Sequence, residues 1–321
     1  MKKINSVLLA LLGILLLVAC DNKGLKKTKS GLLYKIISDE KNPVVKKGQF
    51  IKLSFSQKIS GVKDTVLFSS DSSMPAYVRI DSVPSNAYSP VEIFSLLRKG
   101  DSAVVVQLAD SIQHKSQQPL PPFLHKKDKI VLTLRVEDVF ENEEALQKDR
   151  QVGLDALHAK ETKQVENYLQ LHNIQATKTS LGTFVEVKNP GEGALIDSGK
   201  QVSVIYTGKL FPSGQVFESN DKEDGQPIKF VVGTHTIIPG WDDALRLLKK
   251  GSTATLYIPA FLAYDQKPGP GNKPNENLIF DIKIVDVTNA PPAANVGMMP
   301  TRPGASPRPN MKTPPPAPSK K

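Results

Sequence analysis

The stretch TIIPGWDDALRLLKKG, residues 236–251, decides how the rest of the chain is interpreted, because it carries the only tryptophan, Trp241. Two aspartates directly follow the indole, and two lysines directly precede Gly251. Acidic residues in a first turn and basic residues in a last turn suit the helix dipole, and glycine commonly ends a helix. Trp241, Leu245 and Leu248 are spaced to share one face. The stretch therefore predicts a short helix that begins at the indole and stops at Gly251.

This stretch belongs to the second of two internal repeats. KKGQFIKLSF (46–55) matches DSGKQVSVIY (197–206), and IFSLLRKGDSAVVV (93–106) matches ALRLLKKGSTATLY (244–257), both at an offset of 151 residues. Among the residues identical at that offset are Thr28 and Thr179, Gly31 and Gly182, Gly48 and Gly199, and Gly100 and Gly251. We therefore expect two domains of one fold, over residues 28–140 and 179–288.

Each repeat is predicted to consist mostly of strands. In the second repeat, QVSVIYTGKL, TATLYIP and NLIFDIKIVDV alternate apolar with polar residues and are rich in β-branched side chains. Only one segment of each repeat has a convincing helical pattern. An antiparallel sheet with one short helix covering a face is an α+β arrangement.

Residues 141–178 connect the two repeats and are predicted to be helical. The segment is charged, and Leu154, Leu157, Val165 and Leu169 follow a helix-like spacing. It is expected to form one long helix or two shorter ones. Its role is either that of a spacer packed on its neighbours, which the pattern favours, or that of a dimerisation helix in a homodimer.

The N-terminus has the features of an export signal. Two lysines precede VLLALLGILLLVA, an apolar run too short to span a membrane, and LVAC ends at the only cysteine, Cys20. LVAC resembles the bacterial lipobox, which implies a signal peptide over 1–19 and a lipid anchor on Cys20. The alternative is an ordinary signal peptide with an incidental cysteine. The lipobox interpretation places the protein in a bacterial cell envelope, on a membrane, facing the periplasm or the exterior.

Two polar segments flank the repeats. Residues 20–27 are predicted to be a tether. Residues 289–321 carry ten prolines and no acidic residue, which is typical of a disordered Pro-rich tail. We expect the tail to be a solvated spacer rather than a specific ligand for a partner.

The composition argues against several classes of function. The formal charge is +10, but the lysines are scattered, and no basic helix face interleaved with aromatic residues points to nucleic acid. The five histidines are dispersed and show no metal spacing. We find no nucleophile elbow, phosphate loop or thiol nucleophile. An enzyme site in this chain is therefore expected to be apolar and to use no metal or cofactor.

Four segments of the second repeat carry a specific resemblance. VSVIYTGKLFPSGQVFES, PIKFVVGTHTIIPGWDDAL, KKGSTATLYIPAFLAY and NLIFDIKIVDV, in this order, strongly resemble the FK506-binding protein family of peptidyl-prolyl isomerases. The resemblance covers about 110 residues. It implies a curved antiparallel sheet wrapped around the short helix, with a hydrophobic pocket between them, in each of two domains joined by the helical linker.

The resemblance also assigns residues to the pocket. Trp241 would form the floor that receives the proline ring of the substrate. The Ile238 N–H and the Tyr264 hydroxyl would bind substrate carbonyls. Walls would come from Tyr206, Phe217, Ile237, Ile238, Tyr264 and Phe280, with Ile228 and Ala263 as further substrate-binding residues and Glu218 beside Tyr206 in the catalytic set.

Several residues depart from the family pattern. Glu218 replaces the usual aspartate, and its extra methylene could misplace the carboxylate relative to Tyr206. Ile228 replaces a common phenylalanine, Asp265 a glycine, and Asn272 falls near a usual isoleucine. In the first repeat, Phe55, Pro90 and Gln113 stand where the second has Tyr206, Trp241 and Tyr264. We therefore expect the first domain to be degenerate and inactive as an isomerase.

The expected function is peptidyl-prolyl cis–trans isomerisation of unfolded or proline-containing exported polypeptides by a membrane-anchored protein. The X–Pro bond rotates slowly because resonance gives it double-bond character, and an apolar site disfavours the charge-separated planar form. One alternative is a non-catalytic polypeptide-binding or chaperone module of the envelope. Another is a structural envelope component that uses the repeats as modules.

Overall fold

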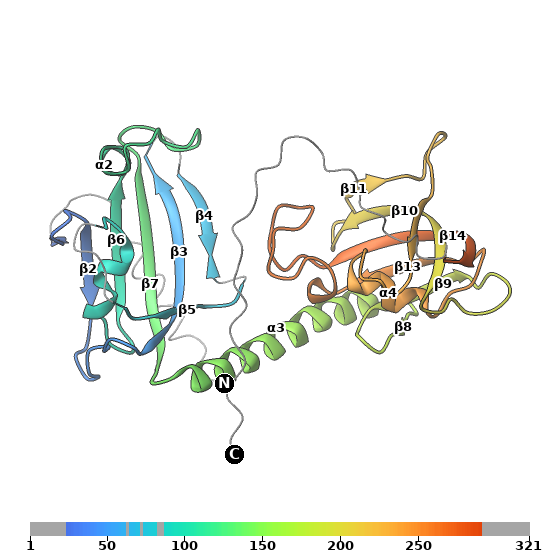
Figure 1. Cartoon of the computed structure of the whole chain (residues 1–321), viewed down its shortest axis with the longest axis horizontal. Helices are drawn as coiled ribbons and strands as arrows, with labels where there is room; N and C mark the ends of the chain where they lie inside the picture. Colours follow the sequence, from blue (N-terminus) through green and yellow to red (C-terminus); the bar gives the residue numbers. More distant parts are fainter. Residues whose placement is uncertain (1–23, 62–63, 71–72, 82–86, 291–321) are drawn as a thin grey trace, which may run out of the picture.

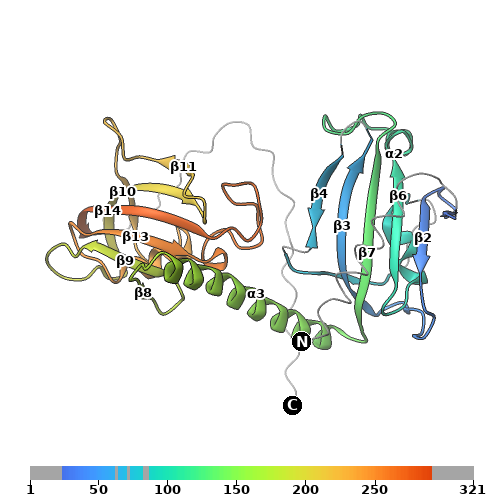
Figure 2. The ribbon, with the colours of Figure 1, turned by 180° about the vertical axis from the view of Figure 1, so that it is seen from behind.

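The computed structural model describes residues 24–61, 64–70, 73–81 and 87–290, and in it two sheets are joined by one long helix (Figures 1 and 2). The predicted α+β class, with two similar antiparallel domains and a helical linker, is confirmed. The predicted signal peptide, Cys20 and residues 291–321 of the predicted tail lie outside the described residues.

The two sheets have the same topology. Within the described residues, each has seven strands, in the orders β1-β2-β6-β7-β3-β4 and β8-β9-β13-β14-β10-β11, with β5 also on β3 and β12 also on β10. The first sheet contains β1 (Lys26–Lys27), β2 (Leu33–Ile37), β3 (Phe50–Ser60), β4 (Thr65–Ser69), β5 (Ala76–Arg79), β6 (Ser102–Leu108) and β7 (Lys129–Phe140). The second contains β8 (Thr177–Lys178), β9 (Phe184–Asn189), β10 (Lys200–Leu210), β11 (Val216–Ser219), β12 (Ile228–Val231), β13 (Thr253–Ile258) and β14 (Leu278–Asn289).

Both sheets begin slightly before the expected domain boundaries. Lys26 pairs with Tyr34 in the first sheet, and Thr177 pairs with Val185 in the second. The end of the predicted tether 20–27 and the end of the predicted linker 141–178 are therefore strands, because each supplies the outermost backbone pairing of a sheet.

Hydrogen bonds outside the strands repeat together with the sequence. The Val45 N–H donates to the Leu97 carbonyl at 2.9 Å, and the Ile196 N–H donates to the Leu248 carbonyl at 2.9 Å. Gly251 closes a turn in a left-handed conformation, with φ 80°, that costs glycine little. These shared contacts show that the 151-residue repeat is a repeat of structure.

The helices differ from the prediction in two respects. Helix α4 (Pro239–Leu245) ends well before Gly251, so Lys249 and Lys250 lie outside it. The reason is that the segment after Leu245 turns to pair with the 192–196 segment, through the Glu192–Lys250 bridge and the Ile196–Leu248 hydrogen bond. Leu248 is nevertheless buried.

The first domain contains more helix than the one predicted segment. The 3₁₀ helix η2 (Pro90–Leu96) occupies the place of α4, and its capping box joins Ser89 to Glu92. A further helix, α2 (Ala109–Ser116), separates β6 from β7. The second domain has instead the short 3₁₀ helix η3 (Ala260–Leu262) at the corresponding place.

The linker is one continuous helix, α3 (Glu143–Leu171), capped by the Asn142 side chain. Val165 and Leu169 pack with Phe184 and Tyr257 of the second domain. This use of the apolar residues favours the spacer interpretation. Within the described residues, no helix has the length and apolar character needed to cross a bilayer.

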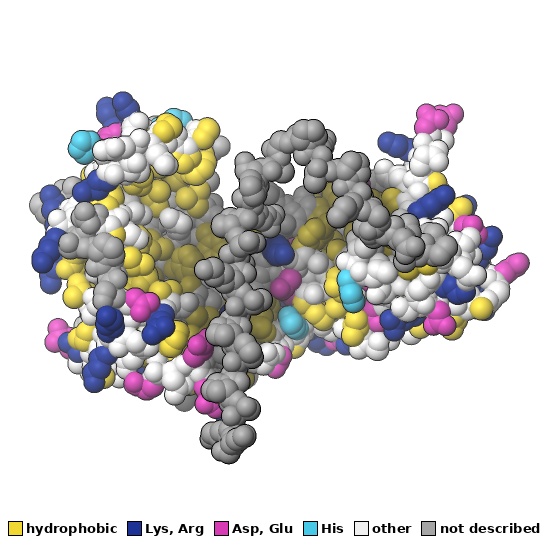
Figure 3. All heavy atoms as spheres, viewed as in Figure 1, with side chains coloured by type: hydrophobic (Ala, Val, Ile, Leu, Met, Phe, Trp, Pro, Cys, Tyr) yellow, Lys and Arg dark blue, Asp and Glu magenta, His cyan; other side chains and the backbone are white. Residues whose placement is uncertain are grey.

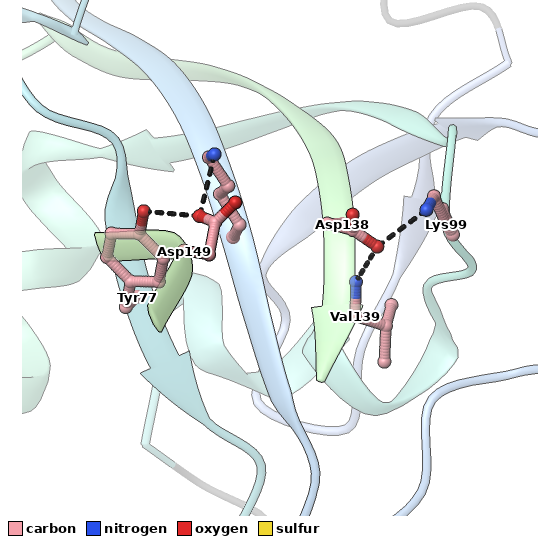
Figure 4. Close-up of polar contacts among 6 residues, drawn as sticks. Tyr77, Lys99, Asp138, Val139 and Asp149 are labelled. Carbon is pink, nitrogen blue, oxygen red and sulfur yellow. Dashed lines mark hydrogen bonds and ion pairs between the residues drawn. The ribbon is translucent and has the colours of Figure 1, made fainter. Parts of the chain in front are cut away.

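The first half of α3 is bound to the first domain. The Asp149 carboxylate accepts hydrogen bonds from Lys52 at 2.8 Å and from the Tyr77 hydroxyl at 2.7 Å, and Figure 4 shows Tyr77 and Asp149 pointing toward one another. A Cβ at Gly153 would lie 2.8 Å from the Met74 side chain, so the helix approaches closely there. Burial opposes ionisation of Asp149, but the two hydrogen bonds outweigh it and lower its pKa.

Asp149→Ala should lower the unfolding free energy of the first domain by about 1 kcal/mol, because it removes the Lys52 ion pair and leaves the Tyr77 hydroxyl without this acceptor. The loss should shrink in acid, as wild-type Asp149 is itself protonated. Urea unfolding followed by circular dichroism measures it, while Trp241 emission reports the second domain separately.

The matched control for this substitution is Asp155→Ala, which removes an exposed carboxylate bonded only to Gln151 on the same helix. It should change the stability by less than about 0.5 kcal/mol. Equal effects of the two substitutions would contradict the docking of α3 on the first domain.

Candidate active site

Trp241 lies at the centre of an aromatic cluster in the second domain. It is 1% exposed, and its ring centroid lies 5.4 Å from those of Tyr206 and Phe280 and 5.9 Å from that of Phe230. Tyr206 and Phe280 meet the indole nearly edge-on, at 85° and 82°, a favoured geometry for aromatic pairs. Because these three rings come from β10, β14 and β12, the sheet must curve around the start of α4.

Two glycines make this close packing possible. A Cβ at Gly208 would lie 2.6 Å from the Phe217 ring and 2.9 Å from that of Phe280. A Cβ at Gly240 would lie 2.4 Å from the Ile258 side chain on β13. The glycines of Tyr-Thr-Gly and Pro-Gly-Trp therefore allow the rings and the helix to approach the sheet.

The predicted pocket residues are brought together around Trp241. Tyr206 and Phe280 are buried, while a half-buried group packs against the same core and keeps part of its surface open. This group consists of Phe217, Ile228, Ile237, Ile238 and Ala263. Glu218 is exposed, and Tyr264 is 42% exposed.

Phe230 is a contact of the indole that the sequence analysis missed. It lies two residues after Ile228 on β12, so both side chains are on the same face of the strand. The alternation of side chains along a strand, which places every second residue on one face, was the signal that could have identified Phe230.

Two hydrogen-bond donors are free beside this cluster. Ile238 precedes the first turn of α4, and its N–H has no acceptor among the residues that the structure describes. The Tyr264 hydroxyl has no hydrogen-bond partner in the same described part of the chain, although it lies close enough to act electrostatically on Tyr206. Both donors are thus available to a ligand carbonyl.

Glu218 lies close enough to Tyr206 to act on its hydroxyl. Burial, and after it the neighbouring Glu218 carboxylate, raise the pKa of the Tyr206 hydroxyl to about 12. The Tyr206 hydroxyl therefore stays protonated at neutral pH. The effect of the extra methylene of Glu218 on catalysis stays a prediction.

The backbone explains two other departures from the family pattern. Asp265 has φ 55° and Asn272 has φ 64°, both in the left-handed region. Glycine is favoured there, and aspartate and asparagine are the side chains that tolerate the region best. Asp265 can therefore stand where the family has glycine.

Two polar side chains that the sequence analysis did not single out hold the cluster in place. Asp243 is 6% exposed and accepts from the Thr179 hydroxyl and, at 3.2 Å each, from the Ser180 hydroxyl and the Leu181 N–H. Asn220 accepts from the Tyr206 N–H at 2.6 Å. Asp243 fixes α4 to the start of the domain, and Asn220 fixes the backbone of β10 at Tyr206.

The first domain lacks the corresponding cluster. Phe55 stacks on Phe68, with centroids 5.0 Å apart, where the second domain has the tyrosine–indole contact. Pro90 begins η2 and Gln113 lies on α2, so neither an indole nor a tyrosine hydroxyl takes those places. In both domains, no group of three or more potential metal ligands occurs among the described residues.

Comparison with known proteins supports the resemblance. Residues 193–285 match the family model of FKBP-type peptidyl-prolyl cis-trans isomerases. A probable isomerase of this type from Haemophilus influenzae is 40% identical over 110 residues, which is 34% of this chain and 44% of the relative. The probable isomerase FkpA from Neisseria meningitidis is 40% identical over 118 residues, 35% of this chain and 42% of the relative.

Other relatives align over a similar region. FK506-binding protein 4 from Neurospora crassa is 37% identical over 34% of this chain and 23% of the relative. The crystal structure of FkpA from Escherichia coli matches with a TM-score of 0.36 and 30% identity, over 46% of this chain and 70% of that chain. The chain spans less than half the length of the curated relatives named here. The second domain therefore carries the sequence features of an FKBP-type isomerase.

Asp243→Ala should lower the unfolding free energy of the second domain by about 2–3 kcal/mol, because it removes a charged acceptor and leaves buried donors unsatisfied. Urea unfolding followed by Trp241 emission measures this directly. Asp224→Ala, at an exposed loop position, is the control and should be silent. An Asp243→Ala protein as stable as the wild type would refute the anchoring role.

Proposed function

We propose that this chain is a peptidyl-prolyl cis–trans isomerase that acts on proline-containing polypeptides, with the second domain as its catalytic unit. The proposal rests on the cluster of Tyr206, Phe280 and Phe230 around Trp241. The Ile238 N–H and the Tyr264 hydroxyl at its edge have no hydrogen-bond partner among the described residues. The match to the FKBP-type family model over the same residues supports the proposal.

The reaction proposed for this site is rotation about the X–Pro amide bond. The planar X–Pro amide has a barrier of ~18–20 kcal/mol, because resonance separates charge between oxygen and nitrogen. Rings around Trp241 would hold the proline, and the two donors would fix the flanking carbonyls. An apolar environment stabilises the twisted, less charge-separated form relative to the planar one. The protonated Tyr206 keeps that wall of the site uncharged.

The proposed setting is a bacterial cell envelope. The lipobox-like LVAC sequence and the similarity to bacterial FkpA-like isomerases support this setting. A lipid on Cys20 would hold the protein on a membrane, and its substrates would be newly exported or unfolded polypeptides. Association of two copies through α3 is disfavoured, since the apolar residues Val165 and Leu169 already face the second domain.

Tyr264→Phe should lower kcat/KM for a proline peptide about three- to tenfold, because it deletes one hydrogen bond of about 1 kcal/mol to the substrate. Since the side chain is 42% exposed, stability should not change. A proline-limited isomerisation assay on the full chain measures it. Tyr34→Phe in the first domain is the matched control and should be silent.

One result would overturn the proposal, and a second would change only its mechanism. A folded wild-type protein that does not accelerate isomerisation would overturn the enzymatic function. A Tyr264→Phe protein with wild-type kcat/KM would remove the hydroxyl from the mechanism while leaving the function intact.

For the first domain we propose polypeptide binding without isomerisation. Its edge strand β4 exposes three consecutive apolar side chains, Val66, Leu67 and Phe68, at 65%, 40% and 38%. Figure 3 shows apolar surface gathered over β3 and β4. An exposed apolar surface of this kind is typical of an interaction site. An edge strand also has unpaired backbone groups that can pair with an extended chain.

Val66→Lys should raise, about three- to tenfold, the concentration of this protein that is needed to suppress aggregation of an unfolded client protein. The reason is that a valine buried by the bound client contributes about 1–2 kcal/mol. Peptide isomerisation should be unaffected. Val152→Lys on α3 is the matched control, since Val152 is 63% exposed and the chemical change is identical. If the two variants suppress aggregation equally well, β4 is not the binding surface.

A further inference from the structure

Helix α3 buries one acidic side chain against the second domain. Glu161 is 2% exposed, and its Oε2 accepts a hydrogen bond from the Phe261 N–H at 3.0 Å. Its Oε1 is also buried and has no hydrogen-bond partner within the described ranges of the chain. Burying a carboxylate with one unpaired oxygen costs folding free energy. Its presence here therefore suggests a task that an apolar residue could not perform.

The contacts of Glu161 form part of a clamp on η3. Asn277, at the start of β14, donates to the Glu161 carbonyl at 3.4 Å and to the Gln164 side chain at 3.2 Å. The same Asn277 side chain accepts from the Ala260 N–H at 2.9 Å. The His158 ring stacks on Phe261 with centroids 4.4 Å apart. Helix α3 therefore holds η3 through hydrogen bonds and a ring contact.

The clamped turn leads directly into the candidate active site. The Ala260 carbonyl accepts from the Ala263 N–H at 2.9 Å and from the Asp265 N–H at 2.8 Å. Tyr264 lies between these two donors, on the same short loop. A displacement of η3 would thus move the Tyr264 hydroxyl relative to Trp241.

We propose that Glu161 is a positioning residue of the isomerase site, which holds η3, and with it Tyr264, in the geometry that binds substrate. The inference rests on the proposed isomerase function. It makes the linker helix part of the catalytic unit, and it predicts that an isomerase domain cut away from α3 is incomplete.

The protonated form of Glu161 suits this task. A neutral carboxyl can accept from the Phe261 N–H and also donate its proton to a neighbouring carboxylate. Asp265 is the acidic group that acts on Glu161, and its buried Oδ1 has no hydrogen-bond partner among the described residues. Protonation removes the negative charge that the buried, unpaired Oε1 would otherwise carry near Asp265.

Burial raises the pKa of Glu161 to about 7, against the opposing Phe261 N–H, and the charge of Asp265 raises it while Lys160 lowers it. His158, on the same helix, covers Phe261. The carboxyl is therefore protonated below pH 7 and ionised above it. Ionisation sets two negative charges against each other under η3, so kcat/KM should fall as the pH rises through 7.

The test compares Glu161→Gln with Glu161→Ala in the full chain. Glutamine mimics the protonated acid at every pH, because it is uncharged and its side-chain oxygen can still accept from the Phe261 N–H. Glu161→Gln should keep the kcat/KM that the wild type has at pH 6 and lose the pH dependence between pH 6 and 8. Glu161→Ala should lose about ten- to a hundredfold in kcat/KM, mainly through KM, because Tyr264 is misplaced. Glu166→Gln, whose carboxylate pairs with Lys163 and Lys178 on the surface, should retain the wild-type profile.

Amide hydrogen exchange over residues 260–265 tests the same inference without activity. At one pH, exchange there should be faster in Glu161→Ala than in the wild type and unchanged in Glu161→Gln at pH 6. If the wild type proves inactive while this difference appears, the isomerase function fails and the positioning of η3 stands. Wild-type exchange and wild-type kcat/KM in Glu161→Ala, or a wild-type pH profile in Glu161→Gln, would overturn the inference.

Discussion

The arrangement of the second domain depends on the packing of one indole against three strands. Trp241 is almost completely buried, and the rings of Tyr206, Phe230 and Phe280 reach it from β10, β12 and β14. A short helix can bring an indole this close to a sheet only where the backbone carries no side chain in the way. The glycines at 208 and 240 meet that requirement, and Asp243 and Asn220 hold the two elements in register.

The first domain shows that the frame and the aromatic cluster are separable. It keeps the strand order and the hydrogen bonds at the repeat offset, including a carboxylate at Glu92 that accepts from Ser30, as Asp243 accepts from Thr179 and Ser180. At the place of Trp241 stands Pro90, and the core around it includes Ile93 and Leu97, which are fully buried, together with Tyr88 and Phe94. The same topology is thus maintained without an indole.

Much of this fold could be predicted from local patterns. The 151-residue repeat predicted two domains of one fold. The β-branched alternation and the glycines at turns predicted the fold class, because each reflects a backbone requirement of residues close in sequence. The end of α4 could not be predicted, because it depends on a bridge between Lys250 and Glu192, far apart in the chain. Helix α2 was missed because its exposed, polar residues carry little periodicity. Within the candidate site, Phe230 was readable from its strand, whereas Glu161 was not: an acidic residue on a charged helix normally faces solvent.

The continuity of α3 sets how long a polypeptide must be to contact both domains at once. A helix of 29 residues is about 43 Å long, and side-chain contacts bind its two halves to different domains. An extended chain of roughly 13 residues covers that distance. A longer polypeptide can touch both domains at once, and its second contact then forms at an effective concentration set by geometry. A shorter peptide meets each domain separately and gains nothing from their connection. If both domains bind polypeptide as proposed, α3 favours long unfolded chains over short peptides through their length.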